Sequence, residues 1–199
     1  MELPHCDDLF MRFFDPWYTD ETRALKRFQA TRPDLLTVDS FANADPNEIS
    51  PLDEDGRHES ARRVHIMTDA AISDLPKYLL LTSEVDIEWV RAFDAYYDRE
   101  KIRDMLNDAD PNDFENSYLI ACCEFGSLIG RVLSDRLPTL SWVYSWPYWE
   151  SSILHVPTGS IIPPYHWAIK KMSEYGVDDG FAEKIEMCVQ MLRDQENAV

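Results

Sequence analysis

One stretch near the middle of the chain is almost free of charge. Across residues 118–133 the only charged side chains are Glu124 and Arg131, and nearly everything else is apolar or small. Both charged residues fall at helical spacing from Ser117, on one narrow stripe. A helix with so little polar surface must be buried on most sides. The sequence therefore predicts a helix over about 113–136 as the central element of the fold.

Small residues recur every fourth position on another face of this predicted helix. They are Cys122, Gly126 and Gly130. A glycine inside a helix costs about 1 kcal/mol relative to alanine. Two glycines on one face therefore indicate a packing role, and we expect a second element to approach the helix backbone closely there.

The apolar period changes from helical to alternating after Pro138. Residues 140–146 alternate apolar and small polar side chains, which is typical of a half-buried strand. Shorter strand patterns at 152–156 and 160–162 follow, separated by turn residues. These segments predict a C-terminal three-stranded antiparallel meander. The fold class is therefore α+β: a predominantly helical domain with one small sheet.

Other segments show helical spacing or capping signals. We expect helices at about 20–30, 56–75, 83–96, 99–107, 164–175 (closed by Gly176) and from Asp178 or Asp179 onward. Residues 1–56 form an irregular, acidic N-terminal segment, with a loop at 42–56. Five aromatic residues between positions 10 and 18 indicate that this segment docks on the body, because disordered tails seldom carry so many. We therefore expect residues 1–199 to form a single domain.

The net charge of the chain restricts the kinds of molecule that it can bind. The chain has 37 acidic against 19 basic residues, a formal net charge of −18. Such a surface repels nucleic-acid phosphates and anionic lipid, so we expect neither a nucleic-acid nor a membrane role. The four cysteines show no disulfide or CxxC spacing and are expected to be buried thiols. Together these features predict a cytoplasmic protein.

A resemblance to known proteins covers residues 124–176. Gly126 and Gly130 on a helix, Trp142 on a strand, a hairpin at 152–162 and a helix opened by Pro163-Pro164 with Lys170-Lys171 inside it resemble an uncharacterised group of bacterial domains of unknown function. Some of those domains look like accessory or immunity-type proteins. The resemblance implies binding rather than catalysis and carries over no catalytic residue.

Standard motifs for metals and cofactors fail in this chain. His58 and His65 are seven residues apart with Arg62 between them, which does not match the zinc motif H-E-x-x-H. Asp108, Asp110 and Asn112 imitate the start of a calcium loop, but Asp113 replaces its required glycine. No phosphate-binding glycine loop and no G-x-S-x-G turn is present. We therefore expect no metal and no cofactor.

Glu124 is the sharpest candidate for chemistry. A carboxylate on a mostly buried helix has a raised pKa and can act as a general acid or base. His155 or His166 would complete such a site, and the protein would then be a small-molecule hydrolase or transferase. The alternative, which we favour, is that Glu124 and Arg131 lie on a solvated stripe without a catalytic role.

Aromatic residues carry the leading hypothesis. Tyr148, Trp149 and Glu150 fall in a predicted turn, where core packing explains large rings less well. Together with Trp146, the last residue of the predicted strand, they form the predicted binding site. Exposed Trp and Tyr dominate binding hot spots, and surrounding acids favour a basic partner. We therefore predict a non-catalytic acidic protein-binding domain, for example an inhibitor or immunity-type protein that masks a basic protein partner. The same turn would also serve as a homodimer contact. Besides the binding domain and the hydrolase or transferase, a third alternative is a structural domain without a discrete site.

Overall fold

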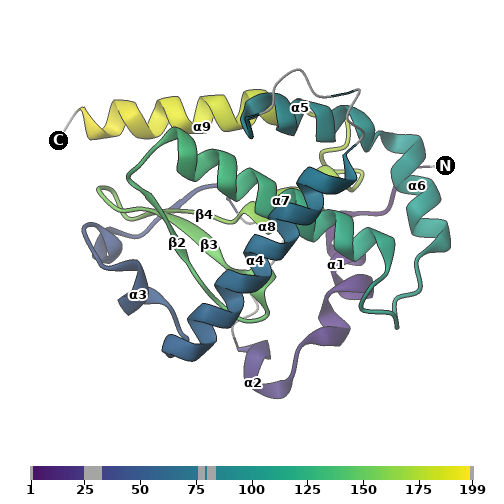
Figure 1. Cartoon of the computed structure of the whole chain (residues 1–199), viewed down its shortest axis with the longest axis horizontal. Helices are drawn as coiled ribbons and strands as arrows, with labels where there is room; N and C mark the ends of the chain where they lie inside the picture. Colours follow the sequence, from purple (N-terminus) through teal and green to yellow (C-terminus); the bar gives the residue numbers. More distant parts are fainter. Residues whose placement is uncertain (1, 25–32, 76–78, 80–83, 198–199) are drawn as a thin grey trace.

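Helix α7 (Ser117–Arg136) runs through the middle of the protein, as a computed structural model shows (Figure 1). Most of its residues are buried, so the predicted central helix is confirmed. It begins later than residue 113 because Asn116 caps it, accepting a hydrogen bond from the Leu119 backbone N–H at 2.9 Å. The structure describes all residues except 1, 25–32, 76–78, 80–83 and 198–199.

The other helices pack around α7. Helix α4 crosses it on one side and α8 packs on the other, while α5 and α9 lie against each other and cover one end (Figure 1). The longer helices besides α7 are α1 (Cys6–Phe13), α4 (Glu54–Asp74), α5 (Ile87–Tyr96), α6 (Arg99–Asp108), α8 (Pro164–Lys171) and α9 (Phe181–Glu196). Among the described helices only α7 is long and apolar enough to cross a membrane, and most of that apolar stretch is buried inside the protein.

The glycine face of α7 receives two aromatic side chains. A methyl group added at Gly126 would lie 2.9 Å from the Cα of Tyr165 on α8, and one added at Gly130 would meet the ring of Trp142. The predicted close approach is therefore confirmed. It sets the spacing between α7, α8 and the sheet.

The sheet has four strands rather than the predicted three. Its order is β1 (Leu36–Thr37), β4 (Ser160–Ile162), β3 (Ser152–His155) and β2 (Leu140–Val143), all antiparallel. The C-terminal meander is confirmed, but the first strand ends at Val143 instead of residue 146. The added strand comes from the N-terminal segment, where Leu36 pairs with Ile161. A two-residue strand has no alternating pattern of its own, so its sequence gives no strand signal.

The N-terminal segment packs into the core. Phe10, Phe13 and Phe14 are fully buried, and Phe13 lies against Tyr118 of α7 with ring centroids 4.9 Å apart. The expected docking of the aromatic cluster is thus confirmed. The predicted helix at 20–30 is present only as α2 (Asp20–Arg23), and its expected continuation from residue 25 lies outside the described residues.

Three boundary predictions are wrong for local reasons. The 42–56 loop contains the short helix α3 (Pro46–Ile49), capped by Asp45, and the first residues of α4, which Asp53 caps. Helix α8 ends at Lys171, before Gly176, because the chain turns to place carbonyl oxygens on the Lys171 ammonium group. Helix α9 starts after Gly180 without a side-chain cap. The helix expected at 83–96 is α5, which begins at Ile87 because Asp86 caps it, and residue 83 lies outside the described residues.

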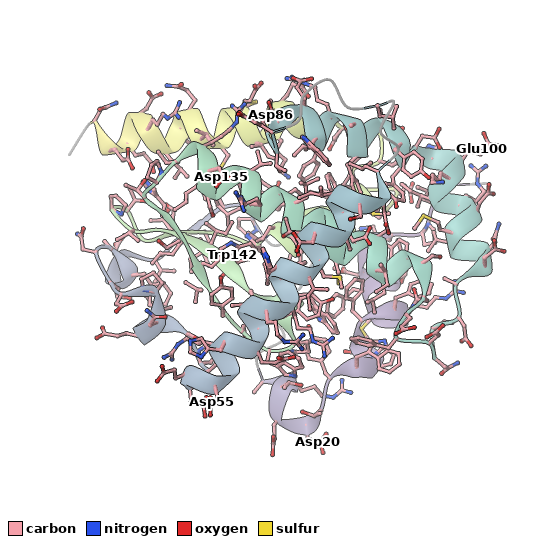
Figure 2. All side chains as sticks on the ribbon, in the orientation of Figure 1. Asp20, Asp55, Asp86, Glu100, Asp135 and Trp142 are labelled. Carbon is pink, nitrogen blue, oxygen red and sulfur yellow. The ribbon has the colours of Figure 1, made fainter. Side chains whose placement is uncertain are left out.

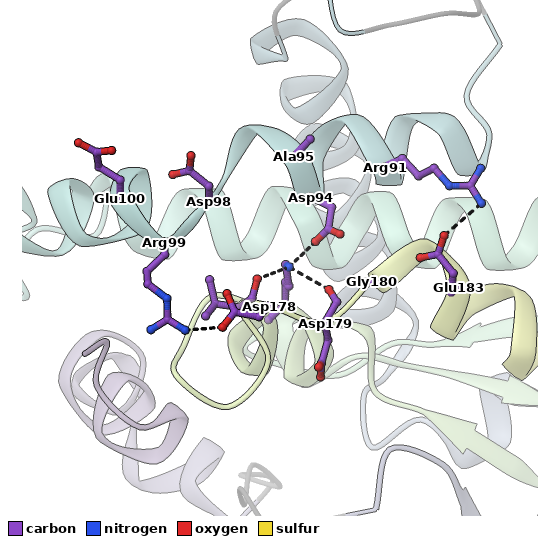
Figure 3. Close-up of a pocket in the computed structure, with 12 residues that line it drawn as sticks. Arg91, Asp94, Ala95, Asp98, Arg99, Glu100, Asp178, Asp179, Gly180 and Glu183 are labelled. Carbon is purple, nitrogen blue, oxygen red and sulfur yellow. Dashed lines mark hydrogen bonds and ion pairs between the residues drawn. The ribbon is translucent and has the colours of Figure 1, made fainter. Parts of the chain in front are cut away.

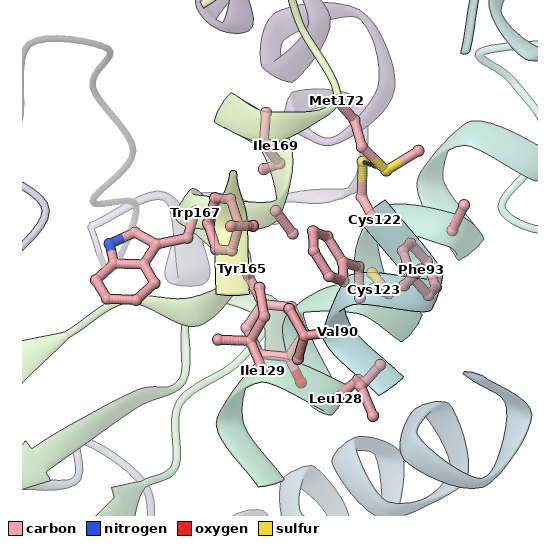
Figure 4. Close-up of a cluster of buried hydrophobic side chains, with 14 of the residues drawn as sticks. Val90, Phe93, Cys122, Cys123, Leu128, Ile129, Tyr165, Trp167, Ile169 and Met172 are labelled. Atoms are coloured by element: carbon pink, nitrogen blue, oxygen red, sulfur yellow. Dashed lines mark hydrogen bonds between the residues drawn. The ribbon is translucent and has the colours of Figure 1, made fainter. Parts of the chain in front are cut away.

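The main core surrounds α7. Figure 4 shows part of it, including Phe93 of α5. The Phe93 ring stacks on that of Phe125 in α7, with centroids 4.4 Å apart. All four cysteines are buried and unpaired, as expected. By contrast, the acidic residues labelled in Figure 2, such as Asp20, Asp55 and Glu100, come from different elements at the periphery. The negative charge is therefore spread over the surface.

Candidate functional site

The aromatic turn predicted to bind a partner is mostly buried. Tyr148 and Trp149 lie in a short 3-10 helix, Tyr148–Glu150, and are only 3% and 2% exposed. The expectation of an exposed turn is wrong, because N-terminal aromatic rings cover it: Phe14 packs edge-on against Trp149. Of the four predicted residues only Trp146 is partly exposed.

Glu150 is the centre of a buried polar network. Its carboxylate accepts a hydrogen bond from the Tyr18 hydroxyl and lies 3.7 Å from Nε2 of His166. Tyr18 in turn accepts a hydrogen bond from the indole of Trp149 at 3.1 Å. Burial, and then the neighbouring Glu150, raises the pKa of Tyr18 well above its usual range. The Glu150 side chain is fully buried, so it cannot contact a partner and instead holds the N-terminal segment in place.

Replacing Tyr18 with phenylalanine tests that role. We expect a loss of about 1.5 kcal/mol in the free energy of unfolding, since the change removes a hydrogen-bond donor from a buried carboxylate. Urea denaturation measures it. The control is Tyr175→Phe, because Tyr175 is 53% exposed. Equal stability of the two variants would contradict the structural role of the network.

The alternative catalytic group is not assembled. Glu124, His155 and His166 each have a different carboxylate partner: Asp74, Glu196 and Glu150, respectively. Glu124 is only 3% exposed, so the prediction that it lies on a solvated stripe is wrong. Burial, and then the nearby Asp74, raises its pKa to about 8. The side chain that interacts with Glu124 is thus Asp74 rather than either histidine.

His155 sits in a chain of polar groups that resembles a catalytic triad. Its Nε2 lies 2.8 Å from Glu196 and its Nδ1 lies 2.7 Å from the Thr158 hydroxyl. The Thr158 hydroxyl, however, donates to Ser160 at 2.8 Å, and the His155 side chain is 0% exposed. None of the four cavities described in the structure is lined by these residues. The chain of bonds therefore attaches the last turn of α9 to the sheet.

A charged cleft lies between the α5–α6 corner and the start of α9 (Figure 3). Its volume is about 620 Å³. The buried Lys171 forms its floor, 2.6 Å from the Asp94 carboxylate and 2.6 Å from the Val177 carbonyl oxygen. The lining residues are Arg91, Asp94, Ala95, Asp98, Arg99, Glu100, Lys171, Val177, Asp178, Asp179, Gly180 and Glu183.

This acidic cleft carries an excess of negative charge. Six carboxylates line it against three cationic side chains. All three cations are already engaged, since Lys171 pairs with Asp94, Arg99 with Asp178 and Arg91 with Glu183. The exposed carboxylates of Glu100 and Asp179 have no cationic partner among the described residues. A cation from another molecule would find them available.

Trp146 lines a separate hollow of about 430 Å³ with Leu52 and Pro51. Glu59 also lines it, but Arg62 and Arg63 bind that carboxylate at 2.7 and 2.9 Å. The hydrogen bonds from these arginines lower the pKa of Glu59 to about 2. The chain itself thus neutralises Glu59, which leaves the exposed Glu21 as the other acid lining the hollow, against six carboxylates in the acidic cleft. The hollow therefore attracts a basic partner less strongly than the acidic cleft does.

Sequence reasoning missed the acidic cleft. Its residues come from 91–100 and 171–183, which no local pattern connects. Each acid alone looks like an ordinary surface residue. Among the described residues, no group of three or more His, Cys, Asp or Glu side chains is placed to hold a metal ion.

Comparison with known proteins adds no family. The chain matches no protein-family model. Searches of curated proteins and of solved structures find no similar protein either. The resemblance of residues 124–176 to a group of bacterial domains therefore stays a prediction.

Proposed function

We propose that the protein is a cytoplasmic, non-catalytic binding domain whose acidic cleft takes the cationic side chains of a basic protein partner. The observation that carries the proposal is the set of unpaired exposed carboxylates around a cleft whose own cations are engaged. Complementary charge of this kind increases the association rate and selects against acidic partners. Four free buried thiols fit a reducing compartment.

An inhibitor or immunity-type protein would use such a surface to mask a basic partner. The enzyme alternative has less support, because Glu124, His155 and His166 pair with three different groups. The excess of 18 acidic residues leaves carboxylates unpaired all over the surface, so a structural domain without a site would show no preference for the cleft over other exposed acids.

The test uses a defined probe, an eight-residue oligolysine peptide, with oligoglutamate as its opposite. We expect calorimetry to show oligolysine binding that weakens steeply between 50 and 200 mM salt, and no binding of oligoglutamate. Glu100→Gln with Asp179→Asn should weaken oligolysine binding about five- to tenfold, because two rim carboxylates lose their charge.

The matched control removes the same charge elsewhere. Asp20→Asn with Asp55→Asn changes two exposed acids on α2 and α4, and we expect less than a twofold effect. Equal weakening by both pairs would mean that the diffuse surface charge, and not the cleft, binds the peptide. Binding that is indifferent to salt would also contradict the proposal.

A further inference from the structure

An apolar groove continues from the acidic cleft along the outer side of α9. The two share Asp179, Gly180 and Glu183. The groove has a volume of about 490 Å³ and lies between α9 and the segment at Asp34 and Leu35. A single ligand can therefore contact both the cleft and the groove.

Two methionines of α9, Met187 and Met191, line this apolar groove, which we call the Met groove. Met187 is 74% exposed and Met191 is 41% exposed, and their spacing of four places them on one side of the helix. The core side of α9 is formed by other residues, among them Ile185, Val189 and Leu192. Packing within the chain thus does not account for the two methionines. Methionine is flexible and polarisable and adapts to varied apolar partners.

The polar groups beneath the Met groove are satisfied by one another. The Lys184 ammonium group lies 2.7 Å from Asp34 and 4.7 Å from the centroid of the Trp167 ring. Asp34 also pairs with Lys170 at 3.0 Å. Although burial alone would raise the pKa of Asp34, the hydrogen bonds from the two lysines lower it. These charged groups are already paired, so a ligand in the Met groove does not have to supply a charge to them. The contact that the groove offers is therefore apolar.

The rim of the Met groove is acidic. Asp179 and Glu183 lie where the groove joins the cleft, and both are exposed. Arg91, which pairs with Glu183, also pairs with Glu88 and Glu186, so this one cation does not neutralise the rim. A ligand that covers the methionines brings its neighbouring side chains to these carboxylates. The ligand that fits this surface therefore has an apolar stripe flanked by Lys or Arg side chains. A helix suits this surface, because a row of side chains at i, i+4 on one helix packs between the corresponding rows of another, and Met187 and Met191 form such a row on α9.

We propose that the Met groove binds a basic amphipathic helix of the partner, with its apolar stripe on Met187 and Met191 and its cations at Asp179 and Glu183. This inference rests on the proposed function and adds the conformation of the segment that is bound. A second copy of the chain is a poorer occupant, because each copy carries a formal charge of −18.

The probe is a synthetic 18-residue peptide of leucine and lysine whose leucines repeat with helical spacing. The control peptide has the same composition in an order that breaks the stripe. We expect the helical peptide to bind at least about tenfold more tightly than the control, since only it presents a continuous apolar face. Met187→Gln with Met191→Gln should remove most of this difference.

Met11→Gln is the matched control variant. Met11 is 54% exposed but lies on α1, outside both the cleft and the groove. We expect less than a twofold change for it. In protein labelled with ¹³C at the methionine methyl groups, the helical peptide should shift the NMR signals of Met187 and Met191 and leave that of Met11 unchanged.

The outcomes separate the two proposals. Binding of the helical peptide that ignores the Met187 and Met191 changes, but weakens with Glu100→Gln and Asp179→Asn, would overturn the groove and leave the acidic cleft standing. Binding that ignores both sets of changes would overturn both proposals. A dimer in sedimentation velocity that Met187→Gln dissociates would assign the groove to self-association and overturn the helix proposal.

Discussion

Replacing Gly126 with alanine should lower the free energy of unfolding by about 2 to 3 kcal/mol. The new methyl group would lie 2.4 Å from the Tyr165 ring and 2.9 Å from its Cα atom. A ring can rotate, but the Cα atom belongs to the backbone of α8, so the two helices must move apart. That cost exceeds the roughly 1 kcal/mol that alanine gains over glycine in a helix. Urea denaturation followed by circular dichroism measures the change.

Gly130 provides the contrast. The three atoms nearest to a methyl group there all belong to the Trp142 indole, a side chain that is partly exposed, and none of them is a backbone atom. Gly130→Ala should therefore cost less than Gly126→Ala. In a Trp142→Ala background the obstacle is gone, and Gly130→Ala should become neutral or stabilising by up to about 1 kcal/mol. An equal penalty in both backgrounds would show that the indole does not set the spacing.

The second large effect concerns Glu124 and pH. Its pKa is raised to about 8 in the folded protein, against about 4.3 in an unfolded chain. The folded state therefore holds a proton that the unfolded state releases. The contribution is fully present below about pH 4.3, falls by up to about 1.4 kcal/mol per pH unit above it, and is lost once the pH passes about 8.

Glu124→Gln should remove this dependence. Glutamine keeps the shape of the protonated acid, and its amide can donate to Asp74, the carboxylate that hydrogen-bonds to Glu124. Tyr97 lies nearby, and its own pKa is raised by burial first and then by Glu124. At pH 9 the variant should be more stable than the native protein by about 2 to 4 kcal/mol, and at pH 4 the two should be alike.

Urea denaturation across pH 4 to 9 makes this comparison. Glu115→Gln is the matched control, because it removes the same charge from an exposed residue just before α7. Its stability should follow that of the native protein at every pH. A native protein that is equally stable at pH 5 and pH 9, and indistinguishable from Glu124→Gln, would contradict the raised pKa.

Local patterns predicted the parts of the fold that depend on neighbours in the sequence. The near absence of charge over 118–133 identified α7, and its glycine spacing indicated the close packing that Tyr165 and Trp142 provide. Alternation after Pro138 identified β2. In each case the physical cause, burial of one face, acts over a few residues and leaves a period in the sequence.

Features that depend on distant residues left no such signal. The Thr37 hydroxyl meets Ser160 from 123 positions away, and Trp149 donates to Tyr18 from 131 positions away. Without the partners in view, Trp149 looked like an exposed ring in a turn. The Met groove had a weak signal, since Met187 and Met191 repeat at i, i+4 outside the buried face of α9.

The N-terminal segment is synthesised well before the residues on which it packs. The buried rings of Phe10, Phe13 and Phe14 leave the ribosome early, while Trp149 and β4, against which this part of the chain packs, follow more than a hundred residues later. At about 5 to 20 residues per second, that delay is on the order of ten seconds. Throughout it the aromatic cluster has no core to enter, so the nascent chain exposes apolar rings that the finished protein conceals.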